Sequence, residues 1–219
     1  SSDKTIENLK RSTSNLDIFE KLNEETGVLI LIKHSTHVEL DIRFMAKELE
    51  LGGMYKPQSN EVMNYLMIRA RNKYVTGAIH NHQAKQAIKW INNGQKFLYA
   101  ADQDYGKKNS QFIPLFGVDA ATVTFPERLS KSGVKIVMAN VSRGLEGFNL
   151  EFHEIADYKE KGSVLKEVNE YYEKFILKSP ENFLWTHRRF KSRPEGEESI
   201  YSEWKSRDKR RKKKRLSRK

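Results

Sequence analysis

The residues best suited to chemistry follow directly after a run of five apolar residues, Val28–Ile32. His34 and Glu39 have four residues between them, and positions five apart on one helix point about 140° away from each other. The two side chains can therefore meet only if His34 lies in a turn and Glu39 on the first turns of a following helix. A carboxylate placed there holds one imidazole nitrogen and makes the other more basic. This spacing predicts His34 as a general base for a hydroxyl nucleophile, with Glu39 as its orienting partner.

Two other acidic arrangements compete with this pair. His37 and Asp41 lie four apart on the same expected helix and could form an exposed hydrogen bond. Asp102 and Asp104 flank a turn after a second apolar run, where ligand sites of open α/β sheets collect. We expect these two aspartates to cap the turn. On spacing alone, a structural or surface role for His34 and Glu39 also stays open.

The chain contains no cysteine, which excludes disulfides, thiolate metal sites and a cysteine nucleophile. His80 and His82 precede an expected helix and are more typical of a solvated helix start than of a metal pair. His153 and His187 have no acidic partner nearby in the sequence, so we expect structural roles. We predict no metal and no cofactor.

The elements that must position His34 alternate between strand and helix patterns. Val28–Lys33 is typical of a strand buried on both faces of a sheet, and the apolar spacing from 38 to 51 predicts a helix behind it. Further helices are expected at 16–22, 60–71, 83–91 and 164–176, and further strands at 97–101, 134–141 and 148–152. This order predicts an α/β fold, a single domain with a central mixed, largely parallel sheet flanked by helices.

Charge divides the 219 residues unevenly. The formal net charge is +11, but the body up to residue 204 is close to neutral because the excess lies in Lys205–Lys219. We therefore expect a polar lead-in at 1–15, one domain at 16–204 and a disordered polybasic tail at 205–219. No apolar run is long enough to span a membrane. Because the chain begins Ser-Ser-Asp without Met, an apolar anchor upstream stays an open alternative.

Several blocks resemble one family over most of the chain. The His34–Glu39 block is followed by Tyr55-Lys56-Pro57, by Asp-Gln-Asp-Tyr-Gly at 102–106 and by Phe-Ile-Pro-Leu-Phe-Gly-Val at 112–118. The longest block is Phe-Leu-Trp-Thr-His-Arg-Arg-Phe-Lys-Ser-Arg-Pro-Glu-Gly at 183–196. Together they resemble the lipid A biosynthesis acyltransferases of the lauroyl and myristoyl transferase type. The last block favours that family over relatives that acylate glycerol phosphate.

This resemblance implies an enzyme at the cytoplasmic face of the bacterial inner membrane. It would move a fatty acyl chain from acyl carrier protein to a hydroxyl of a lipid A precursor, without a cofactor. His34 would be the base and Glu39 its partner, and the acyl chains would lie in a groove lined by helices 38–51 and 60–71. Lys33 departs from the family, in which a small residue usually precedes the histidine.

Three arginines are expected to bind substrate. The resemblance places Arg71 near the active site, where it would bind an anionic group or the developing oxyanion, although a helix-end charge is the alternative. Arg188 and Arg189 would contact the anionic lipid A precursor or the membrane surface, unless they form a solvated edge. The tail could bind anionic lipid, so a non-catalytic polybasic module binding anionic membrane or nucleic acid is the alternative function. We expect no specific nucleic-acid partner.

Overall fold

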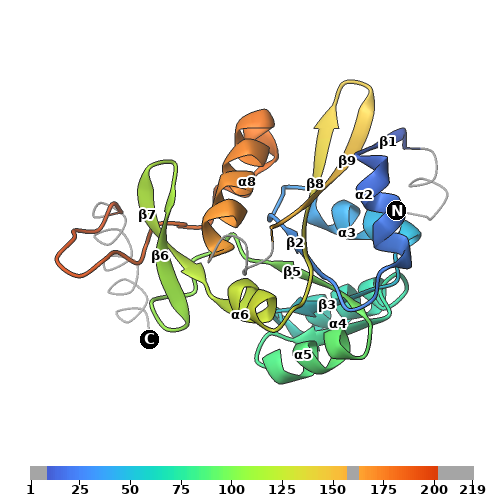
Figure 1. Cartoon of the computed structure of the whole chain (residues 1–219), viewed down its shortest axis with the longest axis horizontal. Helices are drawn as coiled ribbons and strands as arrows, with labels where there is room; N and C mark the ends of the chain where they lie inside the picture. The colour runs from blue at the N-terminus through green and yellow to red at the C-terminus, as the bar shows by residue number, and fades with distance from the viewer. Residues whose placement is uncertain (1–8, 157–162, 202–219) are drawn as a thin grey trace.

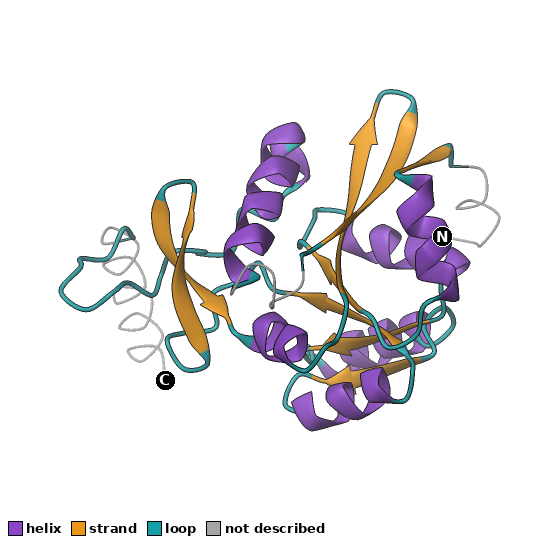
Figure 2. Cartoon of the chain, viewed as in Figure 1, coloured by secondary structure: helices purple, strands orange, loops and turns teal. Residues whose placement is uncertain are grey.

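The structure is a computed structural model that describes residues 9–156 and 163–201. A seven-stranded sheet in the order β1-β9-β8-β2-β5-β3-β4 forms its centre, and β6 and β7 form a separate hairpin (Figures 1 and 2). The strands are β1 (Arg11–Ser14), β2 (Leu29–Ile32), β3 (Leu51–Tyr55), β4 (Gly77–His80), β5 (Lys96–Ala100), β6 (Ser110–Leu115), β7 (Val118–Val123), β8 (Ile136–Gly144) and β9 (Gly147–Glu154).

Strand β2 lies in the middle of this sheet, parallel to β5 on one side and to β8 on the other. Leu29 pairs with Phe97 of β5 and with Ile136 of β8. Only the β8–β9 pair of the large sheet is antiparallel. The expected α/β fold with a mixed, largely parallel sheet is therefore confirmed.

Helices cover both faces of the sheet, which explains the unbroken apolar run of β2. Leu29 and Leu31 belong to a core shared with α5, α6 and α8, whereas Ile30 and Ile32 belong to a second core shared with α2 and α3. The helices are α2 (Leu16–Glu24), α3 (Val38–Glu48), α4 (Glu61–Arg71), α5 (Ala84–Asn92), α6 (Phe125–Lys131), α8 (Leu165–Lys178) and the short η1 (Pro180–Asn182). Alternate side chains of one strand thus fill two cores.

The helix expected at 38–51 ends at Glu48, and Leu51 already starts β3. Gly52 and Gly53 lie inside β3, a strand that the sequence did not predict. The packing of Trp90 explains why residue 52 is a glycine, because a Cβ on Gly52 would lie 2.9 Å from the indole. A Cβ on Gly77 of the neighbouring β4 would lie 2.5 Å from the same ring.

Several further segments carry structure that the sequence did not predict, β4 and α6 among them. Residues 11–14, within the expected polar lead-in, form β1 on the edge of the sheet beside β9. The β6–β7 hairpin extends beyond the main sheet (Figure 1). The expected tail at 205–219 lies outside the described residues. Within 9–156 and 163–201, no helix combines the length and apolarity needed to cross a bilayer.

A buried tyrosine of α8 ties together the ends of β2 and β5. The Tyr172 hydroxyl donates a hydrogen bond to the Ile32 carbonyl at 3.1 Å and accepts one from the Ala101 N–H at 3.2 Å. Tyr172 is 1% exposed, and burial raises its pKa well above the ordinary value, so the hydroxyl stays protonated. These bonds fix the backbone two residues before His34 and one residue before Asp102.

We predict that Tyr172→Phe lowers the free energy of unfolding by about 1–3 kcal/mol, because a buried N–H and a buried carbonyl lose their partner. Urea denaturation followed by circular dichroism measures this loss. Tyr65→Phe is the matched control, since Tyr65 is 59% exposed, and should change stability by less than about 0.5 kcal/mol. Equal effects of the two substitutions would contradict the role given to Tyr172.

Candidate active site

His34 and Asp102 meet at the carboxyl ends of β2 and β5. The His34 Nδ1 lies 2.6 Å from Asp102 Oδ1, and the His34 backbone N–H donates to Asp102 Oδ2 at 2.7 Å. Both residues stand two positions beyond the ends of adjacent parallel strands, so the sheet itself brings them together. The imidazole is 26% exposed, whereas the carboxylate is 3% exposed. The site thus presents the ring to solvent and keeps its partner buried.

The electrostatics of the pair favour a basic imidazole. Burial lowers the pKa of His34, but the charge and hydrogen bond of Asp102 outweigh burial and raise that pKa above 6.5. Burial raises the pKa of Asp102, but His34 and the backbone hydrogen bonds bring it below 3.8. The carboxylate therefore stays ionised and accepts the Nδ1 proton. This leaves Nε2, which has no hydrogen-bond partner among the described residues, as the nitrogen that can take a proton.

Glu39 does not orient His34 in this structure. Its carboxylate pairs with Arg71 of α4, whose Nε donates to Oε2 at 3.1 Å and whose Nη2 donates to Oε1. Glu39 is the second residue of α3, and its side chain is 56% exposed. Asp102 takes the place at the imidazole that the spacing had given to Glu39. The sequence signal for Asp102 was its position directly after a buried strand, the same position that His34 holds.

Arg71 lies close enough to the site to act on it electrostatically. Its positive charge lowers the pKa of His34, against the larger opposite effect of Asp102. The two-point contact with Glu39 fixes the guanidinium, which is 19% exposed. Among the arginines expected to bind substrate, Arg71 therefore acts on His34, while the charge of Arg189 interacts with Asp102.

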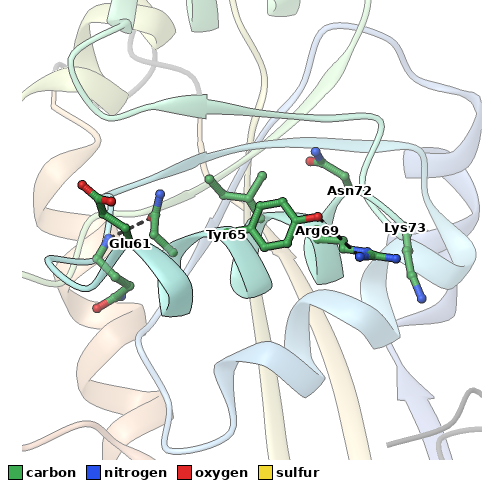
Figure 3. A pocket seen from close by; sticks show the side chains of 8 residues that line it. Glu61, Tyr65, Arg69, Asn72 and Lys73 are labelled. Carbon is green, nitrogen blue, oxygen red and sulfur yellow. Dashed lines mark hydrogen bonds between the residues drawn. The ribbon is translucent and has the colours of Figure 1, made fainter.

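A hollow of about 550 Å³ runs along the same helix (Figure 3). Tyr65 and Arg69 line it, with Glu61, Asn72 and Lys73 along its length. Helix α4 has no buried residue. Its large exposed apolar side chains are Val62, Met63, Tyr65 and Leu66. Helix α4, whose last residue is Arg71, therefore carries exposed apolar side chains.

Comparisons with known proteins identify the family of this chain. The family described as bacterial lipid A biosynthesis acyltransferase matches residues 2–192. The chain belongs to this family. It is 28% identical to the lipid A biosynthesis palmitoleoyltransferase of Escherichia coli K12 over 214 residues, 90% of this chain and 63% of that protein. It is 30% identical to the lauroyltransferase of the same organism over 185 residues, 81% of this chain and 60% of that protein. The chain thus spans about three fifths of the length of these relatives.

The long block at 183–196 packs around the site of this acyltransferase fold. The Leu184 N–H donates to the His34 carbonyl at 3.0 Å. The His187 Nε2 accepts the Asp104 N–H at 2.9 Å, and the carboxylate of Asp104 accepts from the backbone and hydroxyl of Ser192. Asp104 also accepts the Gly106 N–H, so it caps its turn as expected. Asp102 was also expected to cap this turn, but its carboxylate instead forms hydrogen bonds with His34.

The arginines of this block are placed differently from Arg71. Arg189 is 4% exposed and donates to the Ala121 carbonyl at 2.8 Å and to Thr122 Oγ1 at 2.9 Å. Its contacts therefore hold the β6–β7 hairpin rather than face solvent. Arg188 is half-buried in the same loop. The substrate role expected for these two residues stays a prediction.

A second histidine–carboxylate pair lies buried behind the first. The His37 Nδ1 is 2.5 Å from Asp41 Oδ1, and the Ser35 hydroxyl donates to Asp41 Oδ2 at 2.5 Å. The side chains of His37 and Asp41 are 11% and 4% exposed. The expectation of an exposed pair was wrong, because Phe148 covers the His37 ring edge-to-face. This pair fixes the turn that carries His34.

Lys33 is buried at 2% exposure between these acidic groups. Burial lowers its pKa, while the charges of Asp41, Asp102 and Glu151 act in the opposite direction. Its Nζ donates to the Val141 carbonyl at 3.5 Å. No group of three or more His, Cys, Asp or Glu side chains within 9–156 and 163–201 is arranged to hold a metal ion.

We predict that Asp102→Asn lowers the pKa of His34, because the substitution removes the charge that raises it. Nuclear magnetic resonance titration of the imidazole measures the change. Glu39→Gln is the matched control and should move this pKa less, since Glu39 contacts Arg71 instead. A larger shift in Glu39→Gln than in Asp102→Asn would show that Glu39 is the partner in solution.

The same pair predicts a pH dependence of stability. Because the pKa of His34 is raised in the folded state, its protonation stabilises the fold. This contribution is fully present below pH 6.5 and is lost as pH rises through the raised pKa. Because the pKa of Asp102 is lowered in the folded state, its ionised carboxylate stabilises the fold above pH 3.8. This contribution is lost as pH falls through the lowered pKa. Asp102→Asn should therefore destabilise most between these limits, by about 1–3 kcal/mol. Urea denaturation at several pH values tests this, and a loss that grows above pH 8 would contradict it.

Proposed function

We propose that this chain transfers a fatty acyl group from the thioester of acyl carrier protein to a hydroxyl of a lipid A precursor, with His34 as the general base. The observation that carries the proposal is the His34–Asp102 pair, whose Nδ1 is held at 2.6 Å and whose Nε2 is open. Membership of the lipid A acyltransferase family supports the substrate class. The reaction would take place at the cytoplasmic face of the inner membrane.

The transfer needs no acyl-enzyme, because a thioester is already activated. The acceptor oxygen attacks the thioester carbonyl carbon while Nε2 of His34 takes its proton. Asp102 stabilises the imidazolium that forms. When the carbon–sulfur bond breaks, the sulfur leaves as a thiolate and receives that proton, so His34 returns to its neutral form. The products are an ester and free acyl carrier protein.

Arg71 is suited to stabilise negative charge during this step. Its guanidinium is fixed by Glu39 and its charge reaches His34. An arginine held before the reaction can stabilise the oxyanion of the tetrahedral intermediate without reorganising. Glu39 then acts through Arg71 rather than through His34. The exposed apolar side chains of α4 offer a surface for the acyl chains, in keeping with the groove expected between 38–51 and 60–71.

We predict that His34→Gln reduces acyl transfer by about 10²–10⁴-fold, because the proton acceptor is lost. Mass spectrometry of a lipid A precursor incubated with charged acyl carrier protein measures the gain of one acyl chain. His82→Gln is the matched control, since His82 is exposed, and should retain transfer. Undiminished turnover in His34→Gln would overturn the mechanism. Tight binding of the wild type to anionic vesicles without any turnover would favour the alternative, a polybasic binding module.

We also predict that the rate of transfer rises with pH and levels off above the pKa of His34, because only the neutral imidazole takes a proton. In Asp102→Asn the inflexion moves to lower pH, and the rate on the plateau falls. Single-turnover kinetics across pH 5 to 9 give both quantities. An inflexion that stays in place in Asp102→Asn would contradict the assignment of the base.

A further inference from the structure

A basic hollow of about 610 Å³ lies between β1 and the tip of the β8–β9 hairpin. Its charged lining consists of Lys10, Arg11, Arg143 and Lys178 and the carboxylate of Glu146, and the Lys178 ammonium pairs with Glu151 of β9 at 3.0 Å. Neither the acyl-transfer chemistry nor the expected substrate contacts use these residues. A concave surface with such an excess of cations attracts anions.

The arginines of this basic hollow lack anionic partners within the described part of the chain. The Arg11 Nη1 atom is buried without a hydrogen-bond partner. The guanidinium of Arg11 lies over the Phe44 ring at 5.3 Å, and that of Arg143 lies over Phe148 at 6.0 Å. Ring stacking orients a guanidinium but leaves its N–H donors unused. A buried donor without a partner costs free energy, and a bound anion would remove that cost.

Backbone contacts between the start of β1 and the β8–β9 hairpin fix the shape of the basic hollow. Gly147 has a φ of 129°, and a Cβ at this position would lie 2.3 Å from the Lys10 carbonyl oxygen. The Phe148 N–H donates to that same oxygen at 2.9 Å. The close approach fixes the start of β1 against the hairpin. Lys10 and Arg11 are thereby held opposite Arg143.

This basic hollow opens at the same edge of the sheet as His34. Strand β8 runs parallel to β2, and its Val141 carbonyl contacts the Lys33 ammonium. Arg143 follows two residues later in the same direction. Phe148, which lies under Arg143, also packs on His37 at 5.5 Å. A molecule that extends along this edge of the sheet can therefore contact both His34 and the basic hollow.

We propose that the basic hollow binds a phosphomonoester group of the acyl acceptor. A phosphomonoester carries up to two negative charges near neutral pH and accepts several hydrogen bonds, which suits two guanidinium groups with free donors. Phosphate binding itself is independent of the acyl transfer, whereas its assignment to the acceptor rests on the proposed function. Bound there, the phosphate positions a large acceptor so that one hydroxyl reaches His34.

Nuclear magnetic resonance of the arginine Nε–H groups tests binding in the full chain without turnover. Phenyl phosphate is the probe, with dimethyl phosphate as the diester and chloride as the salt control at constant ionic strength. We expect saturable shifts for Arg11 and Arg143 with the monoester, at least tenfold tighter than with the diester. Shifts that match those of chloride would overturn the proposal.

Variants then separate a binding role from a structural one. Arg143→Gln, on the exposed hairpin, should weaken phenyl phosphate binding at least tenfold, and Arg11→Gln should do the same. Lys166→Gln is the matched control, since Lys166 is 77% exposed on α8, and should leave binding unchanged. Equal binding in Arg143→Gln and the control would contradict the site.

Kinetic measurements and competition with inorganic phosphate show whether the bound phosphate belongs to the acyl acceptor or is free phosphate. Arg143→Gln should raise KM for a phosphorylated acceptor at least tenfold with kcat within twofold, and should not alter KM for the dephosphorylated acceptor. Inorganic phosphate should bind at least tenfold more weakly than the phosphorylated acceptor in micelles. Equal affinity for the two would overturn the assignment to the acceptor while leaving acyl transfer by His34 intact.

Discussion

The hydrogen bond between His34 and Asp102 is the contact on which the rest of the site depends. It requires that β2 and β5 be adjacent and parallel, so that residues following the two strands meet at one edge. The buried carboxylate makes the exposed imidazole basic and fixes which nitrogen carries the proton. Tyr172 reinforces this geometry because it bonds the backbone at the ends of both strands.

Several buried polar groups around this bond have a countercharge or a hydrogen-bonding partner, whereas His37 Nε2 is buried without one. Asp41 accepts from His37 and Ser35, and the ammonium of Lys33 lies in the field of three carboxylates. Burial of charge is costly unless such partners are present. These contacts fix the turn from β2 to α3. The same turn carries His34, with Arg71 nearby.

The sequence predicted the fold well wherever the apolar pattern was local. The buried run before His34 and the stripe along 164–176 gave a strand and a helix close to their observed bounds. The pattern missed β3, where the absence of a side chain at Gly52 makes room for Trp90. It also missed β1, a short polar edge strand that depends on β9 for its hydrogen bonds.

The site was predicted only in part, because spacing along the chain cannot show which strands are neighbours. Spacing in the sequence predicts Glu39 as the partner of His34, whereas in the structure Glu39 contacts Arg71. Asp102, 68 positions away, reaches the imidazole through the pairing of β2 with β5. Likewise, the run of cations at 188–193 hides that Arg189 is buried against the β6–β7 hairpin. Long-range packing decides both cases.

The most direct test of His34 as the base is the protonation state of its ring, read from long-range proton–nitrogen correlations at a pH above its pKa. The pairing with Asp102 predicts the tautomer with hydrogen on Nδ1, donated to Asp102, and a bare Nε2. A ring that carries its hydrogen on Nε2 would contradict it, because the nitrogen that faces the acceptor could not then take a proton.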